Sequence, residues 1–152
     1  MSLSRILIAF GFLTFILSVP VNAGPQYLRD GLALGGYDAV AYFTEDRAMQ
    51  GSSDYTYRWN NAEWHFVSAE NRDLFTKNPT KYAPVYDGHC AYGVAKDVKV
   101  PGDPEQWTIY NDRLYVNISQ WIKYRWEWDI PGNLELSEDN WVSLESDPAS
   151  IR

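Results

Sequence analysis

The sequence predicts a small α+β domain: two β-hairpins, in a mixed or antiparallel sheet, packed against short helices and a C-terminal helical segment. Two stretches alternate apolar and polar residues around short turn sequences, which is typical of β-hairpins. Other stretches place apolar residues three and four positions apart, which favours helices. No repeat, low-complexity tract or linker interrupts residues 35–145, so we expect a single compact unit.

The first predicted hairpin joins residues 55–59 to residues 62–67 through Asn60 and Asn61, which tolerate the positive φ of a two-residue turn. The expected pairs are Arg58 with Glu63, Thr56 with His65, Tyr57 with Trp64 and Tyr55 with Phe66. One face of the hairpin is then aromatic and the other polar. His65 belongs to the polar face, and we expect it to face solvent.

A helix is predicted directly after this hairpin, over residues 69–77. Ser68 is the expected N-cap, and Asn78 with Pro79 should end the helix. Leu74 and Phe75 would pack on the aromatic face of the hairpin. Earlier in the chain, Asp38 is expected to cap or brace a loop.

The second predicted hairpin joins residues 107–110 to residues 114–117 through a three-residue turn of Asn111, Asp112 and Arg113. The remaining expected elements are a short helix beginning at Ala91, a loop at residues 101–104 forced by two prolines, and helices over residues 119–128 and 136–144.

The N-terminus has the pattern of a secretory signal peptide. Arg5 precedes an apolar run over residues 6–19, and a break with small side chains ends at Ala23. The run is shorter than the roughly 20 apolar residues that span a bilayer. We therefore expect residues 1–23 to be cleaved, leaving a soluble exported domain of residues 24–152 with no stable membrane anchor.

The charge of the chain excludes some partners. The formal net charge is −7, and removal of Arg5 with the signal peptide would make it more negative still. An acidic protein repels phosphate backbones and anionic lipid surfaces. We therefore expect no nucleic-acid partner.

Cys90 is the only cysteine, so it cannot form a disulfide within the chain. Four roles are open for its thiol: a buried inert side chain, a metal ligand, a nucleophile, or a bridge to another chain. A thiolate together with the imidazole of His89 suits Cu(I) or Zn(II). Because two adjacent residues make an incomplete site, further ligands would have to come from Asp87, His65, a backbone oxygen or a second subunit. In the structural alternative, Cys90 packs inward and His89 lies at the surface.

Several motifs occur in an order that resembles a known family. They are GGYDAVAYF (35–43), WHFVSAENRDLFTKNPTKYAP (64–84), DGHCAYGVAK (87–96) and DPEQWTIYNDRLYVN (103–117). Together they resemble the exported YHS-domain proteins of bacteria. The resemblance implies an α+β fold and a periplasmic location, and it brings no established reaction. Short YHS domains of metal pumps carry cysteines where this chain has Val67, Ser68 and Asn71, so that metal site is not transferred.

Three functional hypotheses follow from these features. The first is a periplasmic protein that binds copper through Cys90 and His89 and exchanges it with a metal donor or acceptor. The second is a non-enzymatic interaction or structural module that docks a protein partner on an aromatic-rich surface. The third is a cysteine-dependent enzyme. No catalytic residue is assigned, because His89 is adjacent to Cys90 in sequence and His65 is expected on the other face of its hairpin.

Overall fold

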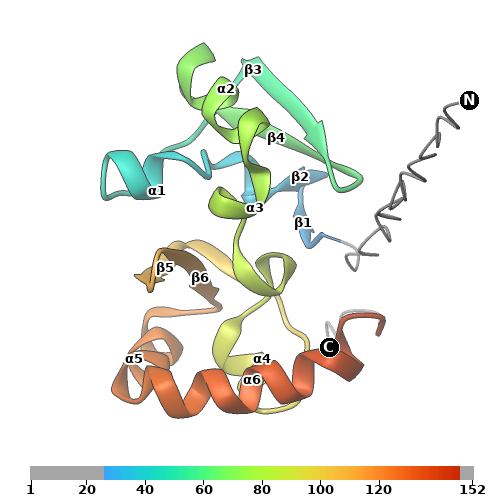
Figure 1. Ribbon diagram of the computed structural model, residues 1–152, viewed down its shortest axis with the longest axis vertical. Coiled ribbons are helices and arrows are strands. Elements are labelled where there is room, and N and C mark those ends of the chain that lie inside the picture. Colours follow the sequence, from blue (N-terminus) through green and yellow to red (C-terminus); the bar gives the residue numbers. More distant parts are fainter. Residues whose placement is uncertain (1–25, 148–152) are drawn as a thin grey trace, which may run out of the picture.

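The structure, a computed structural model, describes residues 26–147 and confirms the α+β class (Figure 1). The predicted signal peptide lies outside the described residues. The strands are β1 (Leu28–Arg29), β2 (Leu32–Ala33), β3 (Ser52–Trp59), β4 (Ala62–Phe66), β5 (Asp103–Tyr110) and β6 (Arg113–Asn117). The helices are η1 (Leu34–Gly36), α1 (Ala41–Thr44), α2 (Ala69–Lys77), α3 (Pro79–Tyr82), η2 (Val85–Gly88), α4 (Ala91–Ala95), α5 (Gln120–Trp128) and α6 (Ile130–Leu144).

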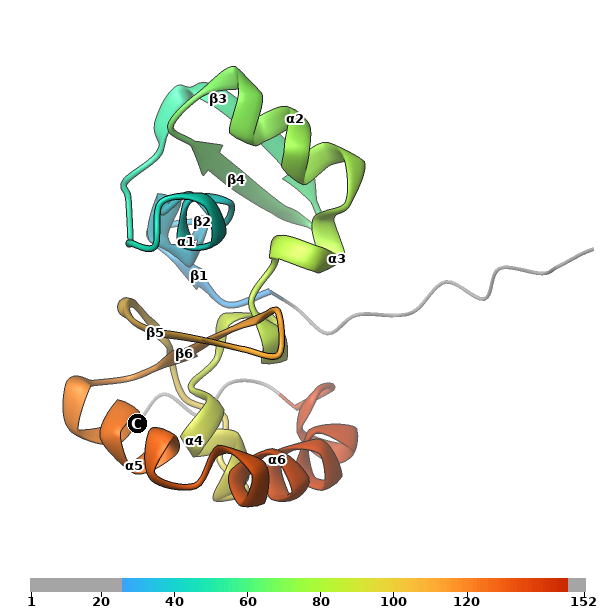
Figure 2. The same cartoon turned by 60° about the vertical axis from the view of Figure 1, so that its left-hand side comes forward.

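The strands form two sheets. Four strands make a mixed sheet in the order β1-β2-β4-β3, with β2 parallel to β4, and β5 pairs with β6 in a two-stranded sheet. Figures 1 and 2 show the mixed sheet with α1, α2 and α3 in one half and the β5–β6 hairpin with α4, α5 and α6 in the other. The chain passes between the halves through α3 and η2.

The first hairpin has the predicted turn and most of the predicted register. Asn60 and Asn61 adopt φ values of 50° and 57°, and the expected pairs up to His65 are present. The pairing of Tyr55 with Phe66 was wrong, because β3 is irregular after Ser52, and Phe66 pairs with Ser52 instead. This bulge leaves Tyr55 packed against the core.

Helix α2 confirms the prediction for residues 69–77. The Ser68 hydroxyl accepts a hydrogen bond of 3.1 Å from the amide of Asn71, as an N-cap should. The chain turns at Asn78 and begins α3 at once with Pro79, whose missing N–H is no loss in a first turn. Sequence reasoning had not anticipated this second short helix.

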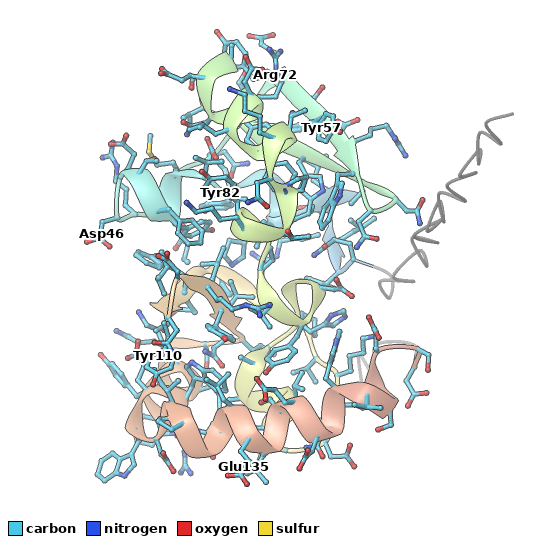
Figure 3. The ribbon with its side chains drawn as sticks, in the orientation of Figure 1. Asp46, Tyr57, Arg72, Tyr82, Tyr110 and Glu135 are labelled. Carbon is cyan, nitrogen blue, oxygen red and sulfur yellow. The ribbon has the colours of Figure 1, made fainter. Side chains whose placement is uncertain are left out.

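Phe75 is the centre of the larger core. Its ring is fully buried beneath the aromatic face of the first hairpin, as predicted. Its centroid lies 4.7 Å from that of Trp64, 5.2 Å from Phe66 and 5.8 Å from Trp59. Figure 3 labels two other aromatic members of this half, Tyr57 on β3 and Tyr82 on α3.

Asp38 braces a loop, as expected, and does so from a fully buried position. One carboxylate oxygen accepts hydrogen bonds from the amides of Val40 and Ala41, at 2.8 and 3.2 Å. The other accepts from the amide of Val67 at 2.9 Å and from the side-chain amide of Asn71 at 2.8 Å. A single carboxylate therefore joins the start of α1 to the junction of β4 and α2.

The second hairpin has longer strands and a shorter turn than predicted. Its turn contains Asn111 and Asp112 alone, with φ values of 49° and 60°, and Arg113 already pairs with Tyr110. The loop predicted over residues 101–104 ends two residues earlier than expected, because β5 begins at Asp103 and includes Pro104. A proline is tolerated here because each strand of a two-stranded sheet has an open edge.

Helices α4, α5 and α6 lie on the side of the second hairpin that faces away from the mixed sheet. Helix α4 begins at Ala91 and α5 ends at Trp128, as predicted. Helix α6 begins six residues before the expected start at 136, since the Asp129 side chain caps it through the amide of Gly132 at 3.0 Å. A smaller core lies here, with Trp126 fully buried at its centre. Within residues 26–147, no helix is long and apolar enough to cross a bilayer.

Candidate functional site

A cleft of about 330 Å³ lies where the two halves of the fold meet. Its walls come from β3, the segment that contains α3 and η2, β6, and α6. Its lining includes four aromatic rings and three charged side chains, namely Trp59, Tyr86, Tyr115, Trp141, Asp87, Arg113 and Glu138. Aromatic walls with a few convergent charged groups are typical of small-ligand sites.

Two residues that line this cleft, Tyr86 and Asp87, belong to a backbone segment in the left-handed region. Tyr86, Asp87 and Gly88 adopt positive φ angles of 58°, 53° and 79° in succession. Only glycine adopts this region freely, so Tyr86 and Asp87 each cost on the order of 1 kcal/mol or more. Backbone strain of this kind is enriched at functional sites.

The carboxyl group of Asp87 is in an unfavourable environment for a charge. Its Oδ2 atom is buried and has no hydrogen-bond partner among the described residues. Burial, together with the charge of Glu145, raises the pKa of Asp87 to about 6, although nearby Lys99 acts in the opposite direction. The ionised group therefore weakens the folded state at neutral pH.

We expect Asp87→Asn to stabilise the protein at pH 7.5. Because the folded pKa lies above the usual value, stability is lost as the pH rises through about 6, and the neutral amide avoids that loss. The gain should be about 1–2 kcal/mol, since solvent screens the partly exposed carboxyl group. Urea unfolding at several pH values measures it. The gain should vanish near pH 4, and an equal gain at both pH values would contradict this account.

Cys90 lies in the core and has structural partners. Its Sγ caps α4 by accepting the amide hydrogen of Gly93 at 3.4 Å, and it lies 3.5 Å from Oδ1 of Asn117. Burial raises the pKa of the Cys90 thiol, although backbone hydrogen bonds partly oppose the shift. A buried, protonated thiol is a poor nucleophile, so this geometry does not favour the cysteine-dependent enzyme.

His89 is buried as well, although the structural alternative expected it at the surface. Its Nδ1 lies 2.9 Å from the carbonyl oxygen of Tyr86, and its ring packs beside Tyr27 and Trp141. Burial is the main cause that lowers the pKa of His89 to about 4, so the ring is neutral at pH 7. The Cys90 thiol, which caps α4, contacts Gly93 and Asn117 and so has different neighbours from the His89 ring.

His65 was expected to face solvent, and this prediction was wrong. Its side chain is only 11% exposed, because Gly36, at the end of η1, lies close to its ring. Its Nε2 lies 3.0 Å from a carboxylate oxygen of Glu63, its neighbour on the same face. His65 is thus part of a small polar pair within the mixed sheet.

The structure does not bring together the four residues proposed as metal ligands, which are Asp87, Cys90, His65 and His89. Between residues 26 and 147, no group of three or more histidine, cysteine, aspartate and glutamate side chains has the arrangement of a metal site. Binding of copper or zinc with a ligand from another chain stays a prediction.

A second feature is an exposed aromatic surface on α5. Trp121, Tyr124 and Trp128 are 65%, 54% and 91% exposed, and their spacing of three and four places them along one side of the helix. Trp126 occupies the opposite side and is fully buried. We call these three exposed rings, with Arg125, the α5 aromatic surface.

A groove of about 570 Å³ runs along this surface. Tyr92 of α4, Asp129, and Asn133 of α6 complete its walls, and Figure 2 shows α4 and α5 side by side below the second hairpin. The guanidinium group of Arg125 lies 5.6 Å from the centre of the Trp121 ring. One aromatic face of the groove therefore already holds a cation.

The sequence pattern singled out Asp87 of the cleft, as a metal ligand, and none of the other residues of these two sites. The cleft unites residues from positions 59 to 141, so no local motif marks it. The α5 aromatic surface did leave a signal: a helix that buries Trp126 and half-buries Ile122 on one side carries three further rings on another. A soluble helix needs a single apolar stripe, and a second stripe points to a binding surface.

Comparison of the chain with models of known protein families, with curated proteins and with solved structures found no match. The YHS resemblance and the periplasmic location therefore stay predictions.

Proposed function

We propose that this domain is a non-enzymatic interaction module that docks a basic segment of a partner protein on the α5 aromatic surface. The exposure of Trp128, 91% in a helix that packs well on its other side, carries this proposal. Large aromatic side chains are enriched among the residues that dominate binding energy at interfaces. We propose that it does so outside the cytoplasm, because residues 1–23 have the pattern of a cleavable signal peptide.

The size of the surface favours a short segment over a second copy of the chain. At roughly 150–250 Å² per aromatic side chain, the exposed parts of the three rings offer about 300–500 Å². A standard stable interface buries about 800 Å² on each partner. The patch is therefore too small for a stable homodimer and large enough for a peptide.

The charge favours a basic partner. The chain has a net charge of −7, which attracts a cationic partner at long range, and Asp129 lines the groove. The electron-rich faces of Trp and Tyr also bind guanidinium and ammonium groups. Arg125 against Trp121 shows the geometry that an arginine of the partner would repeat on Trp128.

We expect an arginine-rich peptide to bind the protein and an otherwise identical glutamate-rich peptide not to bind. Trp128→Ala should weaken binding by about 2 kcal/mol, roughly 30-fold, because the ring is the most exposed of the three. Fluorescence anisotropy of labelled peptide measures the affinity. The melting temperature should stay unchanged, since this ring supports no core contact.

Val142→Ala is the matched control, because Val142 is an exposed apolar residue of α6 outside the groove. It should bind the peptide like the unmodified protein. Equal loss of affinity in both variants, equal binding of the acidic peptide, or no effect of Trp128→Ala would overturn the proposal.

A further inference from the structure

We propose that the cleft between the two halves binds a small organic cation of the amine or guanidinium class. This site is separate from the α5 aromatic surface: the two sets of lining residues share no member. Its volume of about 330 Å³ is at the lower end of ligand pockets, which suits a molecule smaller than a typical drug.

The aromatic walls supply the first argument. Tyr86 and Tyr115 are buried with ring centroids 6.1 Å apart, and Trp141 lies 5.3 Å from Tyr86. Trp59 contributes from the other half of the fold. Rings that approach from several directions form a cage for a cation, whose charge interacts with the ring faces.

The carboxylates supply the second argument. Asp87 holds a buried oxygen with no hydrogen-bond partner among the described residues, and Glu138 lies on the exposed side of the cleft. An ammonium or guanidinium group in the cleft would be attracted by both carboxylates, and Glu138 is exposed to it. Among the lining residues, the two acids outnumber Arg113, the one cation, although Lys99 lies near Asp87 outside the lining.

The cost of the site supplies the third argument. The positive φ angles of Tyr86 and Asp87 and the buried, unpartnered Oδ2 atom of Asp87 both weaken the fold. Such costs are typical of positions kept for binding, because a ligand that neutralises the charge recovers part of the lost stability.

The probe is agmatine, which has a guanidinium and an amine but no carboxylate. Calorimetric titration at pH 7.5 should show saturable binding, and the indole N–H signals of Trp59 and Trp141 should shift in NMR spectra. Glutarate, a dianion of similar length, should not bind. Asp87→Asn should weaken agmatine binding about tenfold or more, since it removes the charge but leaves a stable fold.

Three further variants make the result decisive. Asp139→Asn alters an exposed acid of α6 outside the cleft lining and should bind agmatine normally. Arg113→Ala removes a like charge and should tighten binding severalfold. Trp128→Ala should bind agmatine normally, which separates this site from the α5 aromatic surface. Absence of saturable binding in the millimolar range, equal binding of glutarate, or an unchanged affinity in Asp87→Asn would overturn the proposal.

Discussion

Replacement of Asp38 by alanine is expected to lower the free energy of unfolding by about 3–5 kcal/mol. The fully buried carboxylate accepts four hydrogen bonds, and three of them come from the backbone amides of Val40, Ala41 and Val67. Alanine would leave these amides without a partner in a space closed to water. Urea unfolding followed by circular dichroism measures the loss.

Two controls test the cause of this loss. Asp38→Asn keeps one acceptor oxygen, which can still accept the amide hydrogens of Val40 and Ala41. Its NH₂ group would replace only the oxygen that faces Val67 and Asn71, so this variant should lose less stability than Asp38→Ala. Asp73→Ala removes an exposed acid of α2 and should change stability by less than about 0.5 kcal/mol. If Asp38→Ala and Asp73→Ala behaved alike, the bracing role of Asp38 would be disproved.

Phe75→Ala is expected to lower the free energy of unfolding by a similar amount, about 3–5 kcal/mol. The ring is fully buried, and four aromatic neighbours, Tyr57, Trp59, Trp64 and Phe66, have centroids within 6.4 Å of its own. The residual cavity would be lined by rigid rings that close it poorly. Chemical unfolding, with the intrinsic tryptophan fluorescence as the signal, measures the change.

Phe75→Leu and Leu74→Ala serve as controls for this cavity. Leucine fills most of the space and should cost less than half as much as alanine. Leu74 is only partly buried at the edge of the same core, so its truncation should also cost less. A loss below about 1 kcal/mol in Phe75→Ala would show that the aromatic cluster is not the centre of the fold.

Local signals in the sequence were sufficient for most of the fold. The alternation around Asn60 and Asn61 gave the register of the first hairpin, and Ser68 gave the start of α2, because turns and caps are formed by near neighbours. The exceptions have non-local causes. The bulge after Ser52 keeps Tyr55 on the core, and the open edge of β5 tolerates Pro104.

The candidate sites were much harder to predict. Adjacent residues such as His89 and Cys90 looked like a ligand pair, yet the cap of α4 fixes the thiol while the imidazole packs beside Tyr27 and Trp141. Alternation along β4 placed His65 on the polar face correctly but could not reveal that Gly36 of η1 packs close to it. Burial of a polar face depends on distant parts of the chain.

The two residues on either side of Gly88 respond to acid in opposite senses. As the pH falls from about 6, protonation relieves the penalty at Asp87, whose pKa is raised to about 6. Over nearly the same interval the neutral His89, whose pKa is lowered to about 4, increasingly favours the unfolded chain, which can take up the proton. The stability gained at Asp87 offsets the stability lost at His89. The free energy of unfolding should therefore change less under mild acidification than either residue alone would make it change.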